Sequence, residues 1–223
     1  MFLTILYIIG ISAEAMSATL IAGRHKMDLI GVLFIALAAA IGGGSVRDVL
    51  FGHYPLTWVA HPQYVIVVCV AALLTTLIPR VIARLERLFL ALDALGLVVF
   101  AVIGAEVVRV ELANMSEEAQ TYGVVLVVCG AVITGVFGGV LRDIFCGVVP
   151  LVFRQELYAF VAIITGVLYY LLILWGFSVH NASIISLISG FSLRMLAIHY
   201  KLGVPIFSYE DEPKVPKPKR SEK

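Results

Sequence analysis

Long apolar runs follow one another along nearly the whole chain, and short polar segments separate them. Each run approaches the roughly 20 residues that an α-helix needs to cross the hydrocarbon core of a bilayer. The first run has no basic start and is long enough to span, so it indicates a helix rather than a signal peptide. The pattern predicts seven membrane-spanning helices, at Phe2–Ala22, Leu29–Phe51, Tyr64–Ile82, Leu88–Val108, Val124–Cys146, Leu157–Phe177 and Ala182–His199.

Composition narrows the class of protein further. Of the 223 residues, 61% are hydrophobic and 14% are charged, and the mean hydropathy is +1.02. These values are too apolar for a soluble domain, so we expect an all-α membrane protein whose transmembrane domain covers residues 1–205. The formal net charge of +1 creates no field that would attract nucleic acid, and no nucleic-acid partner is expected.

The basic residues outside the predicted spans lie almost entirely on one side of the membrane. Twelve lie on the side of the C-terminus, and only Arg109, in an acidic loop, lies on the other. Because cytoplasmic loops carry the excess of Lys and Arg, the N-terminus is predicted outside and the C-terminus in the cytoplasm. Residues 206–223 are predicted to form a disordered cytoplasmic tail. Its basic stretch, Lys214–Arg220, also suits contact with anionic lipid headgroups.

The chain contains an internal repeat. The segment GGSVRDVLFG at Gly43–Gly52 matches GGVLRDIFCG at Gly138–Gly147, and a weaker match pairs Ser12–Gly23 with Asp93–Gly104. Each half holds three spans, and because three is odd the second half must enter the membrane from the opposite side. The sequence therefore predicts two inverted three-helix repeats with a seventh helix appended, at residues 1–85, 86–178 and 181–200 respectively.

Glycines lie near the middle of the second and fifth spans, at Gly42, Gly43 and Gly44 and again at Gly138 and Gly139. Glycine weakens a helix by about 1 kcal/mol relative to alanine and permits conformations that a side chain forbids. One interpretation is a break or kink whose freed backbone groups line a wet cavity, since lipid offers them no hydrogen bond. The other is a close helix crossing, because small residues let helices touch. The neighbouring charges favour the break.

An Arg-Asp pair follows the glycines in each half, as Arg47-Asp48 and Arg142-Asp143. A charge near the bilayer centre costs at least about 2.5 to 3.5 kcal/mol, so each of these side chains needs a partner. Adjacent helical residues point about 100 degrees apart, which disfavours pairing within each motif. We therefore expect pairing across the repeats, Arg47 with Asp143 and Arg142 with Asp48. The alternative role is structural, in which buried ion pairs only hold the two halves together.

Other polar residues within the spans give weaker signals. Glu14 and Asp93 lie at nearly matching places in the first and fourth spans, where they either contribute negative charge to a cation path or bond a neighbouring helix. Arg194 in the last span is expected to pack across helices. No metal site or cofactor is expected, because metal-ligand spacing is missing among the cysteines, Cys69, Cys129 and Cys146.

The motif GGGSVRD, echoed as FGGVLRD within a pattern of three plus three plus one spans, resembles the bacterial branch of the trimeric intracellular cation (TRIC) channel family. The resemblance covers about residues 1–205 and implies a homotrimer in the bacterial cytoplasmic membrane. It also implies a pore in each protomer, between the kinked second and fifth helices, that passes monovalent cations, potassium or sodium. The residues that would line or hinge this pore are Gly42, Gly43, Gly44, Ser45, Arg47, Asp48, Gly138, Gly139, Arg142 and Asp143.

Two functions remain open at this point. A passive potassium-permeable channel is the leading interpretation, since Asp48 and Asp143 would neutralise the arginines. The alternative is a secondary transporter of a small zwitterion such as glycine, because the same domain has been labelled a glycine transporter domain and inverted repeats suit alternating access. An enzyme is not expected, because the chain contains no Ser-His-Asp set, metal cluster or nucleotide-binding fingerprint.

Overall fold

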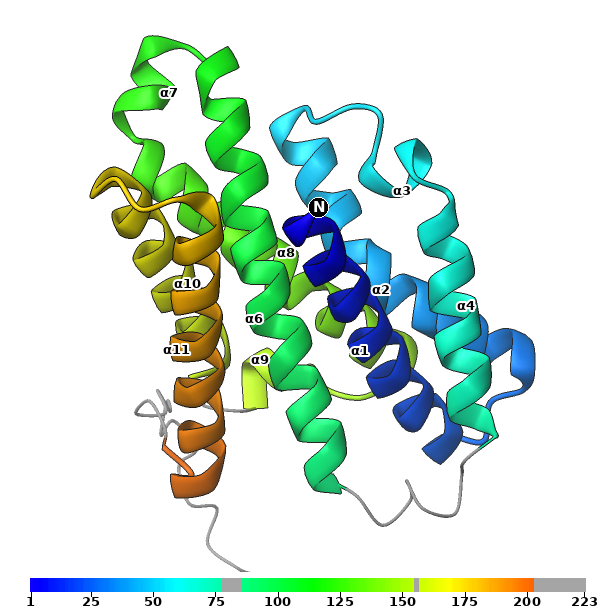
Figure 1. Cartoon of the computed structure of the whole chain (residues 1–223). Coiled ribbons are helices and arrows are strands. Elements are labelled where there is room, and N and C mark those ends of the chain that lie inside the picture. The colour runs from blue at the N-terminus through cyan, green and yellow to red at the C-terminus, as the bar shows by residue number, and fades with distance from the viewer. Residues whose placement is uncertain (78–85, 155–156, 203–223) are drawn as a thin grey trace, which may run out of the picture.

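The computed structural model describes residues 1–77, 86–154 and 157–202, and these residues form a bundle of helices joined by short turns (Figure 1). A helix lies at each predicted span. These helices are α1 (Phe2–Arg24), α2 (Leu29–Phe51), α4 (Gln63–Thr76), α6 (Glu86–Glu111), α8 (Gly123–Phe145), α10 (Tyr158–Leu174) and α11 (Val179–Tyr200).

Length and composition allow five of the described helices, α1, α2, α6, α8 and α11, to cross a membrane. The other two, α4 and α10, are shorter apolar helices of 14 and 17 residues. The predicted end of the third span at Ile82 and the predicted tail at 206–223 lie outside the described residues. The expectation of an all-α membrane protein is confirmed.

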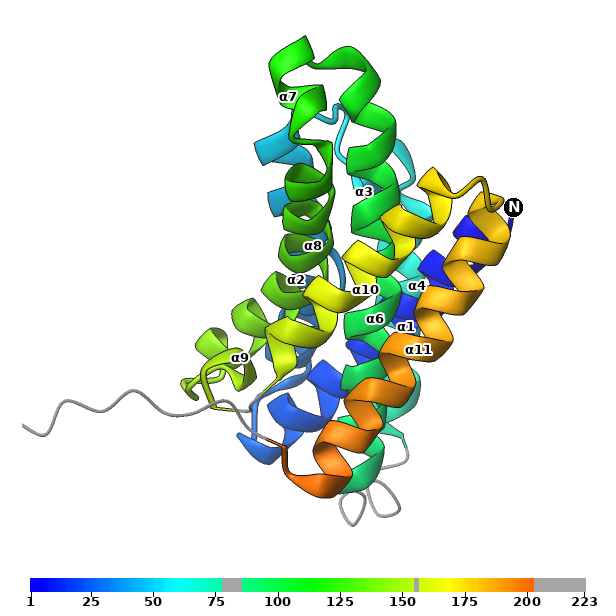
Figure 2. The same cartoon turned by 90° about the vertical axis from the view of Figure 1, so that its left-hand side faces the viewer.

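Successive long helices run in opposite directions through the bundle. In Figure 1, α1 descends from the N-terminus, α2 returns to the upper end, and α11 descends to the lower end of the described chain. Figure 2 shows α10 and α11 side by side from a second direction. The helix α6 is the most buried of the spans, and no part of its Leu97, Val98 or Val99 is exposed. It therefore forms the centre of the apolar core.

Short helices complete the connections. The helix α3 (Thr57–Ala60) follows α2, and α9 (Leu151–Arg154) follows α8, so each comes directly after a copy of the repeated motif. The segments η1 (Leu112–Asn114) and α7 (Glu117–Thr121) join α6 to α8. In Figure 1, α3 lies near the upper end of the bundle and α9 lies lower, so the two motifs lead toward opposite ends.

The helices α2 and α8 cross in antiparallel directions at the glycine motifs. The rings of Phe34 and Phe145 pack with their centroids 5.3 Å apart. A Cβ built on Gly42 would meet Leu141, and one built on Gly138 would meet the carbonyl oxygen of Ala39. Along the contact between the two helices, α2 therefore runs in the opposite chain direction to α8. The crossing lies close to Gly42 on α2 and to its repeat equivalent on α8.

The expected break at the glycines is wrong, because α2 and α8 are each a continuous α-helix of 23 residues that runs through its motif; the expected kink of the two helices stays a prediction. The alternative of a close crossing is the one that the structure shows. A Cβ built on Gly43 would lie only 2.5 Å from the carbonyl oxygen of Thr134 and 3.1 Å from the amide nitrogen of Gly138. Glycine is therefore required here because the two backbones touch, and no side chain fits between them.

Replacing Gly43 by alanine should destabilise the protein. Alanine favours the helix itself by about 1 kcal/mol, but its methyl group would meet backbone atoms of α8 that cannot move away alone. We expect a net loss of about 1 to 3 kcal/mol, measured as a lower thermal unfolding midpoint in detergent. Gly23→Ala is the matched control, because a Cβ there meets nothing within 4 Å. Equal midpoints for the two variants would contradict the close crossing.

Candidate functional site

The Arg-Asp pair of each motif forms an ion pair within its own helix. In α2, Nε of Arg47 donates to Oδ1 of Asp48 at 2.9 Å, and Nη2 donates to the same oxygen at 2.5 Å. In α8, Nε of Arg142 donates to Oδ1 of Asp143 at 2.8 Å. All four side chains are buried. The predicted pairing of Arg47 with Asp143, and of Arg142 with Asp48, is therefore wrong.

The antiparallel crossing explains why the repeats do not exchange partners. Arg47 and Asp143 each lie about one and a half turns beyond the crossing on their own helix, and these directions are opposite. At 1.5 Å of rise per residue, the two side chains start roughly 16 Å apart along the bundle. Each arginine is instead long enough to fold back onto its own neighbour. The last glycine of each motif lies beside the folded-back guanidinium: a Cβ on Gly44 would lie 3.8 Å from Nη2 of Arg47, and one on Gly139 would lie 3.5 Å from Nη2 of Arg142.

Each aspartate also anchors the turn that follows its helix. Oδ2 of Asp48 accepts hydrogen bonds from the backbone amide of Thr57 at 2.7 Å and from its hydroxyl at 2.9 Å. Oδ2 of Asp143 accepts from the backbone amide of Leu151 at 2.9 Å. Thr57 and Leu151 are the first residues of α3 and α9, whose amides have no partner within their helices. The motif thus closes the same turn in both halves.

The Arg47 end contains few other charges. Nη2 of Arg47 donates to the hydroxyl of Thr57 at 3.0 Å. Nδ1 of His53 lies 3.3 Å from Oδ1 of Asp48, and Nε2 of the same ring lies 3.9 Å from Oε1 of Glu111. Because the side chain of His53 is 33% exposed, this end of the motif reaches the surface of the helix bundle.

Ser45, the remaining predicted site residue of α2, binds the same turn. Its hydroxyl donates to the carbonyl oxygen of Ile41 at 2.8 Å and accepts from Nε1 of Trp58 at 3.1 Å. The serine therefore holds the indole of α3 against α2.

The Arg142 end gathers four further polar side chains. Nη1 of Arg142 donates to Oδ1 of Asp93 at 2.8 Å and to the hydroxyl of Ser17 at 2.9 Å. Oε2 of Glu14 lies 3.6 Å from the same nitrogen. The hydroxyl of Tyr158 donates to Oδ1 of Asp93 at 3.4 Å. Glu14 and Asp93, which the sequence singled out without a definite role, therefore both contact the repeat motif.

A second arginine lies beside this cluster. The guanidinium of Arg194 in α11 packs over the ring of Tyr158, 4.7 Å from its centroid. This contact confirms the expectation that Arg194 packs across helices. The guanidinium of Arg142 lies over the ring of Phe89 at 5.2 Å. Helices α1, α6, α8, α10 and α11 thus all contribute to one buried polar centre.

The two ends of the repeat differ in charge. Among the described residues, Arg47 forms an ion pair with one carboxylate, that of Asp48, whereas Arg142 forms ion pairs with Asp143, Asp93 and Glu14. The position that matches Asp93 in the first half is Ser12, which carries no charge. The first helices of the two repeats therefore already differ in charge in the sequence.

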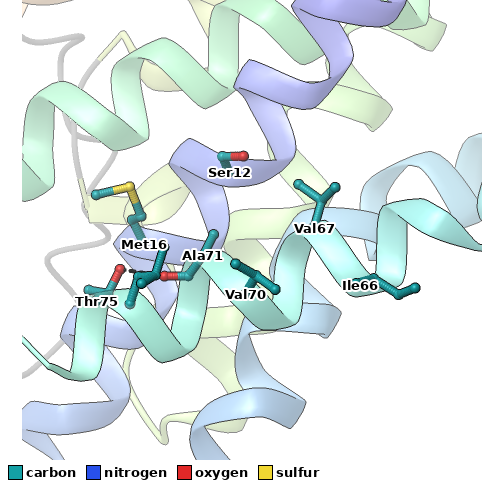
Figure 3. Close-up of a pocket in the computed structure, with 8 residues that line it drawn as sticks. Ser12, Met16, Ile66, Val67, Val70, Ala71 and Thr75 are labelled. Atoms are coloured by element: carbon teal, nitrogen blue, oxygen red, sulfur yellow. Dashed lines mark hydrogen bonds between the residues drawn. The ribbon is translucent and has the colours of Figure 1, made fainter.

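Ser12 lies instead on an apolar groove between α1 and α4 (Figure 3). The groove has a volume of about 460 Å³, and its lining consists of Ser12, Met16, Ile66, Val67, Val70, Ala71, Leu74 and Thr75. The hydroxyl of Thr75 donates to the carbonyl oxygen of Ala71 at 2.7 Å. None of the predicted pore residues lines this groove, so it is separate from the charged centres.

A protein family described as Glycine transporter matches the chain at residues 4–80 and 90–173. The chain belongs to this family. It is 35% identical over 207 residues to the UPF0126 inner membrane protein YadS of Escherichia coli K12, covering 92% of this chain and 95% of that protein. A UPF0126 membrane protein of Vibrio cholerae is also 35% identical, over 209 residues that cover 92% of this chain and 84% of that protein.

Solved TRIC structures share the fold. A structure described as the basis for conductance through TRIC cation channels is 33% identical with a TM-score of 0.81, covering 94% of this chain and 98% of that chain. The trimeric intracellular cation channel orthologue of Rhodobacter sphaeroides is 28% identical with a TM-score of 0.82, covering 90% and 99%. The resemblance to the TRIC family seen in the repeated motif is confirmed.

In this TRIC-family chain the predicted site residues fall into three places. The glycines lie at the α2–α8 crossing, the Arg47 pair lies toward α3, and the Arg142 pair lies toward α9. Sequence reasoning missed Ser17, Thr57 and Tyr158. Thr57 follows Asp48 at nearly the spacing at which Leu151 follows Asp143, so the repeat itself carried that signal. Ser17 and Tyr158 come from other helices, and only folding brings them to Arg142.

Neutralising the two motif aspartates should have unequal effects. Asp48→Asn leaves Arg47 without the one carboxylate that pairs with it among the described residues, which we expect to cost about 3 to 5 kcal/mol. Asp143→Asn leaves Arg142 paired with Asp93, so the loss should be nearer the 1 to 3 kcal/mol of an impaired hydrogen bond. Thermal unfolding of both variants in the same detergent measures the difference, and a larger loss for Asp143→Asn would contradict it.

Proposed function

We propose that this chain is a cation channel. The observation that supports it best is the fold shared over 94% of the chain with a structure described for conductance through TRIC cation channels. The buried charges lie on the two helices that carry the repeated motif, where intramembrane ionisable residues mark ion pathways by default. The proposed ions are potassium and sodium, and the surrounding partner is membrane lipid.

The proposed path follows α2 and α8 past the glycine crossing. Its lining and hinge are the residues predicted from the motif, with the Arg47 pair on one side of the crossing and the Arg142 pair on the other. At the crossing the backbones of Gly43 and Gly138 touch, which leaves no space for an ion between them. The arrangement is therefore a closed one, and conduction requires α2 and α8 to separate.

Charge at the Arg142 end favours cations over anions. Three carboxylates surround this guanidinium, so the local potential is negative despite the arginine in the lining. Rings of acidic side chains select cations in channels by the same electrostatics. The first half has the uncharged Ser12 at the position that matches Asp93. The excess of negative charge in the proposed path therefore lies on one side of the crossing only.

The proposed topology has seven membrane-spanning helices, with repeats at 1–85 and 86–178 and a seventh helix at 181–200. Equivalent positions of the repeat, Gly43 and Gly138, lie beside one another on antiparallel helices, as an inverted repeat requires. We place the chain in the bacterial cytoplasmic membrane with its N-terminus outside and its C-terminus in the cytoplasm. A homotrimer with one pore in each protomer completes the proposal.

A second candidate is a secondary transporter of a zwitterion such as glycine. Two observations favour it: the matching family is described as Glycine transporter, and the Arg142 centre holds both charges that a zwitterion needs. The guanidinium would bind the carboxylate, and Glu14 with Asp93 would bind the amine. This alternative requires saturable movement of glycine across the membrane.

Recording in planar bilayers under a potassium gradient tests the channel. We expect discrete current steps that reverse near the potassium equilibrium potential and do not depend on glycine. Arg142→Gln should raise the cation conductance by about 2- to 10-fold, because it removes a positive charge from a path that concentrates cations. Arg109→Gln is the control, since Arg109 pairs with Glu106 at the far end of α6. A silent bilayer with saturable glycine uptake into liposomes would support the transporter instead.

The inverted repeat can be checked by cysteine labelling. In a background without Cys69, Cys129 and Cys146, single cysteines replace two exposed side chains, Tyr54 after α2 and Val149 after α8. An impermeant thiol reagent added outside intact cells should label Tyr54→Cys, because we place that turn outside. Val149→Cys should react only after the membrane is opened. Labelling of both positions from one side would overturn the inverted topology.

A further inference from the structure

The centre around Arg142 contains polar atoms that the fold leaves unused. Three such atoms belong to side chains that are at most 1% exposed. Within the described part of the chain these atoms, Oε2 of Glu14, Oδ2 of Asp93 and Nη2 of Arg142, have no hydrogen-bond partner. A buried carboxylate oxygen without a partner is costly, so such atoms indicate a missing ligand, water or ion.

Counting donors shows why Arg142 does not satisfy these oxygens. Its Nη1 carries two hydrogens, which are directed to Asp93 at 2.8 Å and to Ser17 at 2.9 Å. Oε2 of Glu14 lies 3.6 Å from that nitrogen, beyond hydrogen-bonding distance. The hydrogen of Nε is directed to Asp143. The guanidinium attracts the Glu14 carboxylate but has no Nη1 or Nε hydrogen left to give it, and the two hydrogens of Nη2 have no acceptor within the described residues.

The formal charges around Arg142 also indicate a missing positive ion. The carboxylates of Glu14, Asp93 and Asp143 contribute three negative charges, and Arg142 contributes one positive charge. Even if Arg194 beside Tyr158 is counted as a second positive charge, one negative charge remains within the described centre. A net buried charge is strongly unfavourable in a lipid-embedded protein. A bound monovalent cation offsets part or all of this negative charge.

A glycine makes room for the carboxylate of Glu14. A Cβ built on Gly96 of α6 would run into the carboxylate of Glu14, so any larger residue there would displace that carboxylate from the centre. Gly96 follows Asp93 by about one helical turn, so the Glu14 carboxylate of α1 packs against the face of α6 that carries Asp93. The hydroxyls of Ser17 and Tyr158 lie in the same centre, bonded to Arg142 and to Asp93 respectively.

We propose that Glu14 and Asp93 form a binding site for one monovalent alkali cation, with Arg142 positioned beside it. The site deepens the proposed channel function, on which its role in conduction rests. It places the resting position of the ion on α1 and α6 rather than on the motif helices themselves. The first half has no equivalent, because Ser12 stands where the second half has Asp93. The ion path therefore has one binding position and not a symmetric pair.

Thermal unfolding of the purified full chain in detergent tests the site. A ligand that binds only the folded state raises the unfolding midpoint. At constant ionic strength we expect a higher midpoint in potassium or sodium chloride than in choline chloride, whose cation is too large for the site. Separate potassium and sodium series identify the preferred ion. Equal midpoints in all three salts would overturn the proposal without any need for a variant.

Variants locate the effect. With Glu14→Gln or Asp93→Asn, at least tenfold more potassium or sodium should be needed to produce the same rise in the unfolding midpoint. Glu106→Gln is the matched control, because Glu106 is a buried carboxylate of α6 whose two oxygens are bonded by Arg109 and Tyr169. A cation effect that persists in both site variants would overturn the assignment. So would an infrared band of a protonated carboxyl that Glu14→Gln removes, since a proton would then supply the positive charge.

Bilayer recordings on the same preparations separate this site from the channel itself. Currents without cation-specific stabilisation would refute the site and leave the channel. Cation-specific stabilisation without currents would refute the channel and leave the site. If both hold, the current through Asp93→Asn should depend less on the potassium concentration, in parallel with the loss of cation-specific stabilisation. Glu106→Gln should change neither the current nor the stabilisation.

Discussion

Burying two guanidinium groups inside an apolar bundle is the constraint on which the rest of this structure depends. Each arginine needs a carboxylate within reach, and in both motifs the next residue supplies it. That aspartate uses its second oxygen on the first amide of the following short helix. Ion pair, turn and short helix are therefore one unit, and the same unit is built twice, at opposite ends of the antiparallel α2–α8 crossing.

The side chains that surround the two units differ between the repeats. The Arg47 unit reaches partly exposed His53, whereas the Arg142 unit is enclosed by α1, α6 and α10 and receives two additional carboxylates. A duplicated fold can carry different chemistry at its two equivalent positions because the packing helices, not the motif helices, supply the variable side chains. A single position, Ser12 in one half and Asp93 in the other, accounts for much of the difference.

In the proposed channel, the touching backbones at Gly43 and Gly138 close the path between the two charged units. Glycine here removes all side-chain bulk between α2 and α8, so the barrier at the crossing consists of backbone packing alone. Helices held by such packing can separate without extracting a large side chain from a neighbour. The charged units, in contrast, tie each helix end to the short helix that follows it.

Hydrophobic patterning by itself determined the all-α membrane class and located each long helix to within a few residues wherever the structure describes it, because bilayer thickness leaves few alternatives to a helix. The duplicated motif likewise located the two arginines and their aspartates. Partner choice was decided only by tertiary structure. Local geometry argued against pairing between neighbours, and nothing in the spacing shows that an antiparallel crossing separates Arg47 from Asp143 or that glycines bring backbones together instead of breaking helices. The meeting of Glu14, Asp93 and Arg142 depends on three helices packing in register, and contacts of that kind follow from the shape of the folded bundle, not from the order of residues along it.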